Sequence, residues 1–112
     1  MMIDYEATMK SIGNDRSLFE TLVQIFLEDY PALLADLGQA VKSESNEAVY
    51  SAAHRLKGLV SNFHTKELVD ILAEIEVSAR SAQSTSTAVA VQNISMLCTA
   101  MANELKSRLA GT

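Results

Sequence analysis

The stretch 50–65 constrains the fold most, because its apolar side chains recur at helical spacing. At about 100° per residue, one face of a helix over this stretch is apolar and the other is polar or small. The apolar face carries Val49, Ala52, Ala53, Leu56, Val60 and Phe63, and the opposite face carries Tyr50, His54, Lys57, Gly58 and Ser61. The pattern predicts a core-facing helix that holds a histidine on its solvent side.

Gly58 lies inside this predicted helix, one turn after His54. Glycine in a helix interior costs about 1 kcal/mol relative to alanine, so its presence has to be explained. One explanation is access, because a missing side chain leaves room for a partner's backbone or for a phosphoryl group. The other is a close contact between helices, or a helix that ends early. Periodicity leaves both open.

Two helices are expected before this stretch. Residues 4–11 predict a short helix with Asp4 as its N-cap. Residues 16–43 carry apolar side chains at spacings of three and four, which predicts a long amphipathic helix capped by Asn14 or Asp15. Pro31 lies inside the long helix and removes one backbone hydrogen bond. Because the apolar period continues in phase on both sides, we expect a kink near Leu27 and not a break.

The later part of the chain continues the helical pattern. The expected elements are a helix over 46–62 capped by Asn46, a helix over 66–81 capped by Thr65, a loop over 82–86, and a helix from Ser86, its cap, to about Leu109. No segment favours a strand. The sequence therefore predicts an all-α fold, an antiparallel up-down four-helix bundle with a short extra N-terminal helix, as a single domain over 1–112.

Composition narrows the class of function. The net charge of −5 argues against nucleic-acid binding, because phosphate backbones are captured by basic surfaces. No run of eighteen apolar residues is present, which predicts no membrane span, and the N-terminus lacks a basic segment followed by an apolar one. The lone Cys98 lies in an apolar helical pattern and is expected to be a buried, reduced thiol. These features predict a cytoplasmic protein.

The motif His54-Arg55-Leu56-Lys57-Gly58 resembles the His-x-x-Lys-Gly motif of histidine-containing phosphotransfer (HPt) domains, which serve two-component phosphorelays. The resemblance extends over most of the chain. It includes Asp4-Tyr5, Ile12-Gly13-Asn14-Asp15, the stretch from Phe26 to Leu34, and Ser61-Asn62-Phe63. The chain departs from the family pattern after Gly58, where relatives generally carry a run of small residues and then a glycine. Here the run is Leu59-Val60-Ser61-Asn62-Phe63, and His64 stands at the glycine position.

The resemblance implies a role for each of five residues. His54 would accept the phosphoryl group, and Lys57, on the same helix face at i+3, would compensate its charge. Gly58 would give access to the imidazole. Arg80 would face the histidine from the next helix as a second cation, and Glu76 would hold the ring by a hydrogen bond.

The resemblance also implies partners. These are response-regulator receiver domains and a hybrid histidine kinase, with Mg²⁺ supplied by the receiver and no cofactor of the chain's own. The docking patch would comprise Met9, Ile12, Leu18, Phe19, Gly58 and Ser61. Plain core packing remains an equal alternative for Leu18 and Phe19. We expect a monomer.

Other chemistry is disfavoured by the residues themselves. No glycine-rich phosphate loop is present, so the expected role is that of a phosphocarrier and not of an enzyme. A metal site is not expected, because His54 and His64 fall on roughly opposite helix faces with no cysteine pair nearby. Cys98 on an apolar stripe is expected to be inert.

Two alternatives to the phosphocarrier stay open. The first is a non-catalytic docking module of the same fold that binds a receiver or a kinase. Retention of both His54 and Lys57 disfavours it, since docking alone needs neither. The second is the phosphoacceptor domain of a chemotaxis-type kinase, which an ATP-binding domain would phosphorylate.

Overall fold

The computed structural model describes residues 2–81 and 88–111. The described residues form five α-helices and no strand, which confirms the predicted all-α fold of four long helices and a short N-terminal one. The helices are α1 (Tyr5–Ser11), α2 (Arg16–Lys42), α3 (Asn46–Ser61), α4 (Lys66–Arg80) and α5 (Ala88–Ala110).

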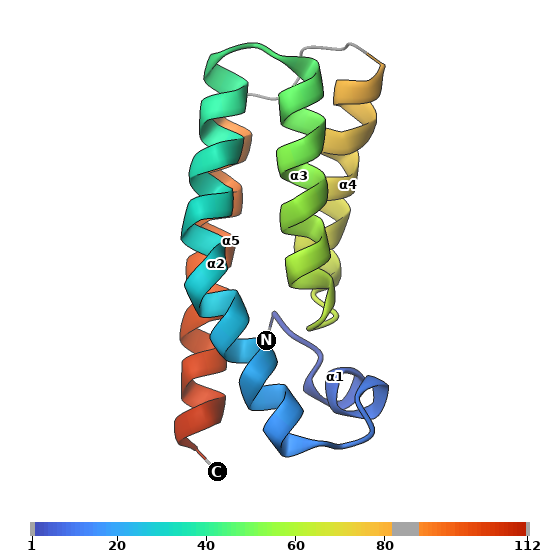
Figure 1. Ribbon diagram of the computed structural model, residues 1–112, viewed down its shortest axis with the longest axis vertical. Coiled ribbons are helices and arrows are strands. Elements are labelled where there is room, and N and C mark those ends of the chain that lie inside the picture. Colours follow the sequence, from blue (N-terminus) through green and yellow to red (C-terminus); the bar gives the residue numbers. More distant parts are fainter. Residues whose placement is uncertain (1, 82–87, 112) are drawn as a thin grey trace.

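The four long helices run along the length of an elongated bundle, and α1 lies across its lower end (Figure 1). The principal extents are 44 × 20 × 20 Å. Helix α3 packs against both α2 and α4, whereas α5 packs mainly against α2. The helix that carries the histidine motif is therefore held from two sides, and its outer side faces solvent.

Side-chain caps begin the first three helices. Asp4 accepts a hydrogen bond from the amide of Ala7 at 2.9 Å, as predicted, and Asp15 caps α2. The predicted cap of α3 is wrong by one residue. Ser45 is the N-cap, and its hydroxyl accepts from a backbone amide at 3.2 Å, while Asn46 is the first helical residue. Both residue types cap well, so the sequence did not separate them.

The N-terminus of α4 follows the prediction only in position. Thr65 occupies the N-cap site, but its side chain makes no capping hydrogen bond, and its Oγ1 is buried without a hydrogen-bond partner in the described part of the chain. Helices α2, α3 and α4 each end one residue before the predicted boundary. The predicted loop over 82–86 and the predicted cap Ser86 lie outside the described residues.

Pro31 does not end α2, which stays helical through it. Figure 1 shows the N-terminal part of α2 inclined to the rest of the helix, on the N-terminal side of the proline. This agrees with a kink, as the continuous apolar period predicted.

An aromatic cluster at the lower end fixes α3 in place. The ring of Phe63, just past the end of α3, lies 5.9 Å from Phe26 and 6.3 Å from Phe19, edge to face in both pairs. The carbonyl of Phe63 also accepts a hydrogen bond of 3.1 Å from the amide of Asp4. Because the three phenylalanines are fully buried, they anchor the base of the helix on which the histidine stands.

Candidate functional site

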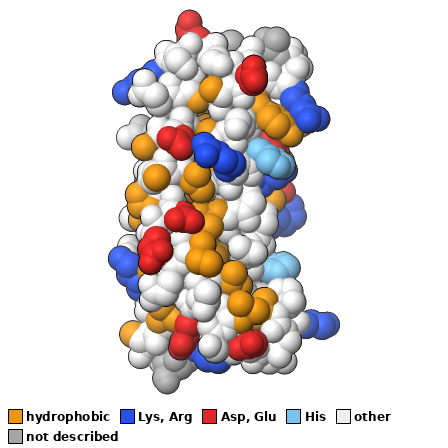
Figure 2. All heavy atoms as spheres, viewed as in Figure 1, with side chains coloured by type: hydrophobic (Ala, Val, Ile, Leu, Met, Phe, Trp, Pro, Cys, Tyr) orange, Lys and Arg blue, Asp and Glu red, His pale blue; other side chains and the backbone are white. Residues whose placement is uncertain are grey.

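Helix α3 presents two chemically different faces. Val49, Ala52, Ala53, Leu56 and Val60 are buried, as the periodicity predicted. On the outer face the side chain of His54 is 60% exposed. Pale blue histidine atoms are visible at the surface in Figure 2, where an apolar strip runs along the same face over α2 and α3.

A carboxylate from α4 joins the two polar side chains of the motif. One oxygen of Glu76 lies 2.6 Å from His54 Nδ1, and the other accepts a hydrogen bond of 2.5 Å from Lys57 Nζ. The side chain of Glu76 is only 9% exposed. The family resemblance implied that Glu76 holds the ring, and the geometry brings His54, Lys57 and Glu76 into one cluster.

The protonation state of Glu76 decides which imidazole nitrogen is free. Burial acts to raise the pKa of this carboxyl, but hydrogen bonds from Lys57 and His54 outweigh it, and the pKa lies below its usual value. Glu76 is therefore ionised near neutral pH and can only accept hydrogen bonds. In the neutral imidazole of His54, Nδ1 must then carry the proton, and Nε2 is left with a lone pair.

Gly58 lies on the exposed side of α3, and a Cβ built on it would meet nothing within 4 Å. A close helix-helix contact therefore does not explain this glycine. The helix also continues beyond it to Ser61, so an early helix end does not explain it either. Of the explanations that the sequence left open, access to the surface beside His54 remains.

Arg80 approaches the cluster indirectly. The sequence placed it facing the histidine, but its guanidinium carbon lies over the ring of Tyr50, 4.6 Å from the ring centre. Tyr50 in turn stacks on His54, with ring centres 5.7 Å apart and planes inclined by 10°. Sequence reasoning assigned Tyr50 no role. The available signal was its spacing, because residues i and i+4 are neighbours on a helix surface.

Comparison with known families identifies the family to which the chain belongs. The model of the Hpt domain matches residues 21–109. The chain belongs to the Hpt domain family. Members of this family are histidine phosphotransfer modules of phosphorelays, where they act as phosphocarriers and interact with receiver domains and histidine kinases. Comparisons with curated proteins and with solved structures gave no significant match.

The matched segment of the Hpt domain contains the whole cluster around His54, whereas the docking candidates on the first two helices precede it. Those candidates divide by exposure. Phe19 is fully buried and Met9 is 8% exposed, so both pack in the core and neither offers a surface to a partner. Ile12 is half-buried, and Leu18 is 40% exposed. Exposed Gly58 and Ser61 complete the accessible set.

The lone cysteine of the Hpt domain is buried in the core. Burial raises the pKa of the Cys98 thiol to about 12, so it stays protonated and unreactive.

Residues 2–81 and 88–111 contain no group of three or more acidic, histidine or cysteine side chains that could hold a metal. No helix within these residues is long and apolar enough to cross a membrane.

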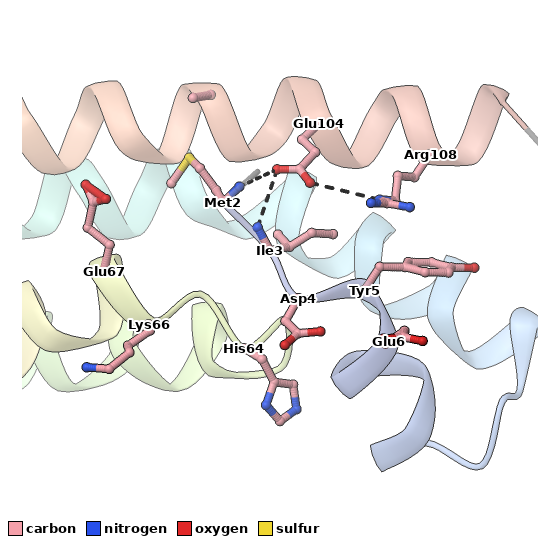
Figure 3. A pocket seen from close by; sticks show the side chains of 11 residues that line it. Met2, Ile3, Asp4, Tyr5, Glu6, His64, Lys66, Glu67, Glu104 and Arg108 are labelled. Carbon is pink, nitrogen blue, oxygen red and sulfur yellow. Dashed lines mark hydrogen bonds and ion pairs between the residues drawn. The ribbon is translucent and has the colours of Figure 1, made fainter.

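A groove of about 980 Å³ lies away from this cluster (Figure 3). It opens between the N-terminal segment, the α3–α4 turn and α5, where Glu104 accepts the amide hydrogens of Met2 and Ile3 at 3.0 and 3.4 Å. It includes His64 but none of His54, Lys57 and Glu76. Its size therefore does not mark it as the site of phosphotransfer.

Proposed function

We propose that this Hpt domain accepts a phosphoryl group on Nε2 of His54 from the aspartyl phosphate of a receiver domain, and passes it to the aspartate of another receiver. The observation that carries the proposal is the hydrogen bond between His54 Nδ1 and ionised Glu76. This bond leaves Nε2 as the nucleophilic nitrogen, and the imidazole that carries it is mostly exposed.

The transfer step balances without a separate base. The lone pair of Nε2 attacks phosphorus, the bond from phosphorus to the aspartyl oxygen breaks, and the aspartate leaves as a carboxylate. The ring keeps its Nδ1 proton and gains positive charge, which the Glu76 carboxylate compensates through the existing hydrogen bond. The reverse sequence hands the phosphoryl group to the next aspartate. The receiver supplies the Mg²⁺ that this exchange needs.

Lys57 is positioned to neutralise the transferred group. Its ammonium donates to Glu76, and a lysine ammonium has two further donors. It can therefore keep its bond to Glu76 while it donates to a phosphoryl oxygen. Gly58, which leaves open space, lets the partner approach on the same side.

Phosphoryl transfer from a labelled receiver tests the proposal. The domain is incubated with a receiver carrying ³²P on its aspartate, and the label is followed on the wild type and on His54→Gln. We expect acid-labile, alkali-stable label on the wild type alone, since phosphohistidine has this stability and acyl phosphate does not. Absence of label from both proteins, with binding of the receiver intact, would overturn the proposal in favour of a docking module.

A further inference from the structure

Two pairs of side chains connect α3 to α4 on the exposed face. Tyr50 and His54 are four residues apart on α3, and Glu76 and Arg80 are four residues apart on α4. Because the helices run antiparallel, Tyr50 meets Arg80 and His54 meets Glu76. The imidazole is thus held at its Nδ1 edge by a carboxylate and on its face by an aromatic ring.

The contact geometry indicates that the ring of Tyr50, and not its hydroxyl, does this holding. The planes of Tyr50 and His54 are nearly parallel with centres 5.7 Å apart, which is the range of offset stacking. Within the described part of the chain the hydroxyl of Tyr50 has no hydrogen bond. Tyr50 is half-buried and packs against the core, so its ring is supported from behind.

The same ring determines where Arg80 lies. Arg80 is exposed on the last turn of α4, and a long exposed side chain there has many rotamers open to it. Its guanidinium carbon lies 4.6 Å from the ring centre of Tyr50 in a cation–π contact, and the same ring stacks on His54, so Tyr50 connects the guanidinium to the imidazole. Without the tyrosine ring, nothing in the described contacts would keep Arg80 near His54.

We propose that Tyr50 is a positioning residue of the phosphoacceptor site, whose ring fixes the plane of the His54 imidazole and holds the Arg80 guanidinium on the same side of the bundle. This inference rests on the proposed function, since it assigns Tyr50 a role in that same transfer. A single orientation of the imidazole keeps Nε2 toward the partner, and the nearby guanidinium supplies charge to the arriving phosphoryl group. Arg80 then depends on Tyr50 for its position.

A double-mutant cycle with a small phosphoryl donor tests this. Phosphoramidate transfers its phosphoryl group to imidazole and releases ammonia, so receiver docking plays no part. The variants are Tyr50→Leu, Tyr50→Phe, Arg80→Gln and the double variant Tyr50→Leu/Arg80→Gln, each with its melting temperature measured. We expect Tyr50→Leu to slow phosphorylation of His54 by about 2- to 12-fold, and Tyr50→Phe to stay within about 2-fold of wild type.

The cycle separates positioning from mere structural support. If Arg80 acts through Tyr50, Arg80→Gln slows the wild type but has no further effect in the Tyr50→Leu background. An equal effect of Arg80→Gln in both backgrounds would overturn the proposal. So would a Tyr50→Leu rate equal to wild type, or a loss in Tyr50→Phe as large as in Tyr50→Leu.

A second readout needs no phosphoryl group and so does not depend on the proposed function. Three-bond couplings of the unphosphorylated His54 side chain report whether it occupies one rotamer. We expect one rotamer in the wild type and in Tyr50→Phe, and averaged couplings in folded Tyr50→Leu. A single unchanged rotamer in Tyr50→Leu would overturn the positioning role. If the wild type takes no phosphoryl group from any donor, the proposed function fails. The comparison of His54 rotamers between the wild type and Tyr50→Leu still tests the positioning role.

Discussion

His54 and His64 are the same residue type ten positions apart, and both are exposed, but the contacts of their imidazoles differ. His54 stands on the outer face of α3, bound at Nδ1 by Glu76 and stacked on Tyr50. His64 lies in the turn between α3 and α4 with a positive φ of 52°. Its imidazole makes no hydrogen bond or ion pair with any other described residue.

Exposure is common to the two imidazoles, so exposure alone does not distinguish the proposed phosphoacceptor from His64. Both imidazoles are exposed, but only His54 has a fixed proton position and a cation beside it. The backbone conformation at His64 explains why relatives carry a glycine there. Its left-handed conformation suits glycine, which is the residue that the family resemblance implies at this position.

Replacing each histidine in turn should give the largest effect. His54→Gln should remove all receiver-derived label, whereas His64→Gln should be labelled at the wild-type rate, because His64 lies outside the cluster of His54, Lys57 and Glu76. Gel autoradiography of both variants after incubation with the phosphorylated receiver measures this. Loss of label in His64→Gln, with folding intact, would contradict the distinction between the two histidines.

Leu56→Ala tests the helix beneath His54. Leu56 is fully buried, and its truncation should lower the free energy of unfolding by about 2–5 kcal/mol through a cavity. Lys57→Ala, the neighbouring position on the outer side, should cost less, about 1.5 kcal/mol, because it removes one charge-assisted hydrogen bond from Glu76 and no core contact. Urea titrations of the two variants give both values, and equal losses would show that the assigned helix faces are wrong.

Lys57→Ala should have its main effect on transfer. Loss of a charge-assisted hydrogen bond to the phosphoryl group is expected to slow phosphorylation of His54 by about 10- to 100-fold. Single-turnover transfer from the phosphorylated receiver measures the rate, with Lys66→Ala as the matched control. Lys66 pairs with Asp70 on the exposed surface of α4, away from the cluster, so its removal should leave the rate unchanged.

Glu76 is the partner that His64 lacks, and it predicts a pH dependence. The pKa of Glu76 is lowered on folding from 4.5, so its contribution to stability is present above about pH 4.5 and is lost as the pH falls through the folded pKa. The stability difference between wild type and Glu76→Gln should therefore shrink under acid conditions. Urea titrations at pH 7 and at acid pH check this, and a difference that grows in acid contradicts it.

The smallest expected effect concerns the other histidine. His64→Gly should raise the free energy of unfolding by about 0.5–1 kcal/mol, because glycine adopts the left-handed conformation without the cost that a Cβ brings. Transfer to His54 should not change. Thermal unfolding gives the sign, and a destabilised His64→Gly protein would show that the imidazole makes a contact of its own.

The sequence predicted the features that depend on the local pattern of residue types along the chain. Periodicity placed the helices and set Leu56 inward and His54 outward, because the helical repeat fixes both. It could not give the meeting of Tyr50 with Arg80, which depends on how α3 and α4 align. It could not separate Phe19 from Leu18 either, because both are apolar and the burial of Phe19 depends on tertiary contacts with Tyr5 and Phe63.

The position of the phosphoryl group on the imidazole tests the account most directly. A domain labelled with ¹⁵N in its histidines is phosphorylated by a receiver, and the ring nitrogens are examined by NMR. The account predicts coupling of phosphorus to Nε2 of His54, with the proton retained on Nδ1 opposite Glu76. Phosphorus on Nδ1, or on either nitrogen of His64, would contradict it.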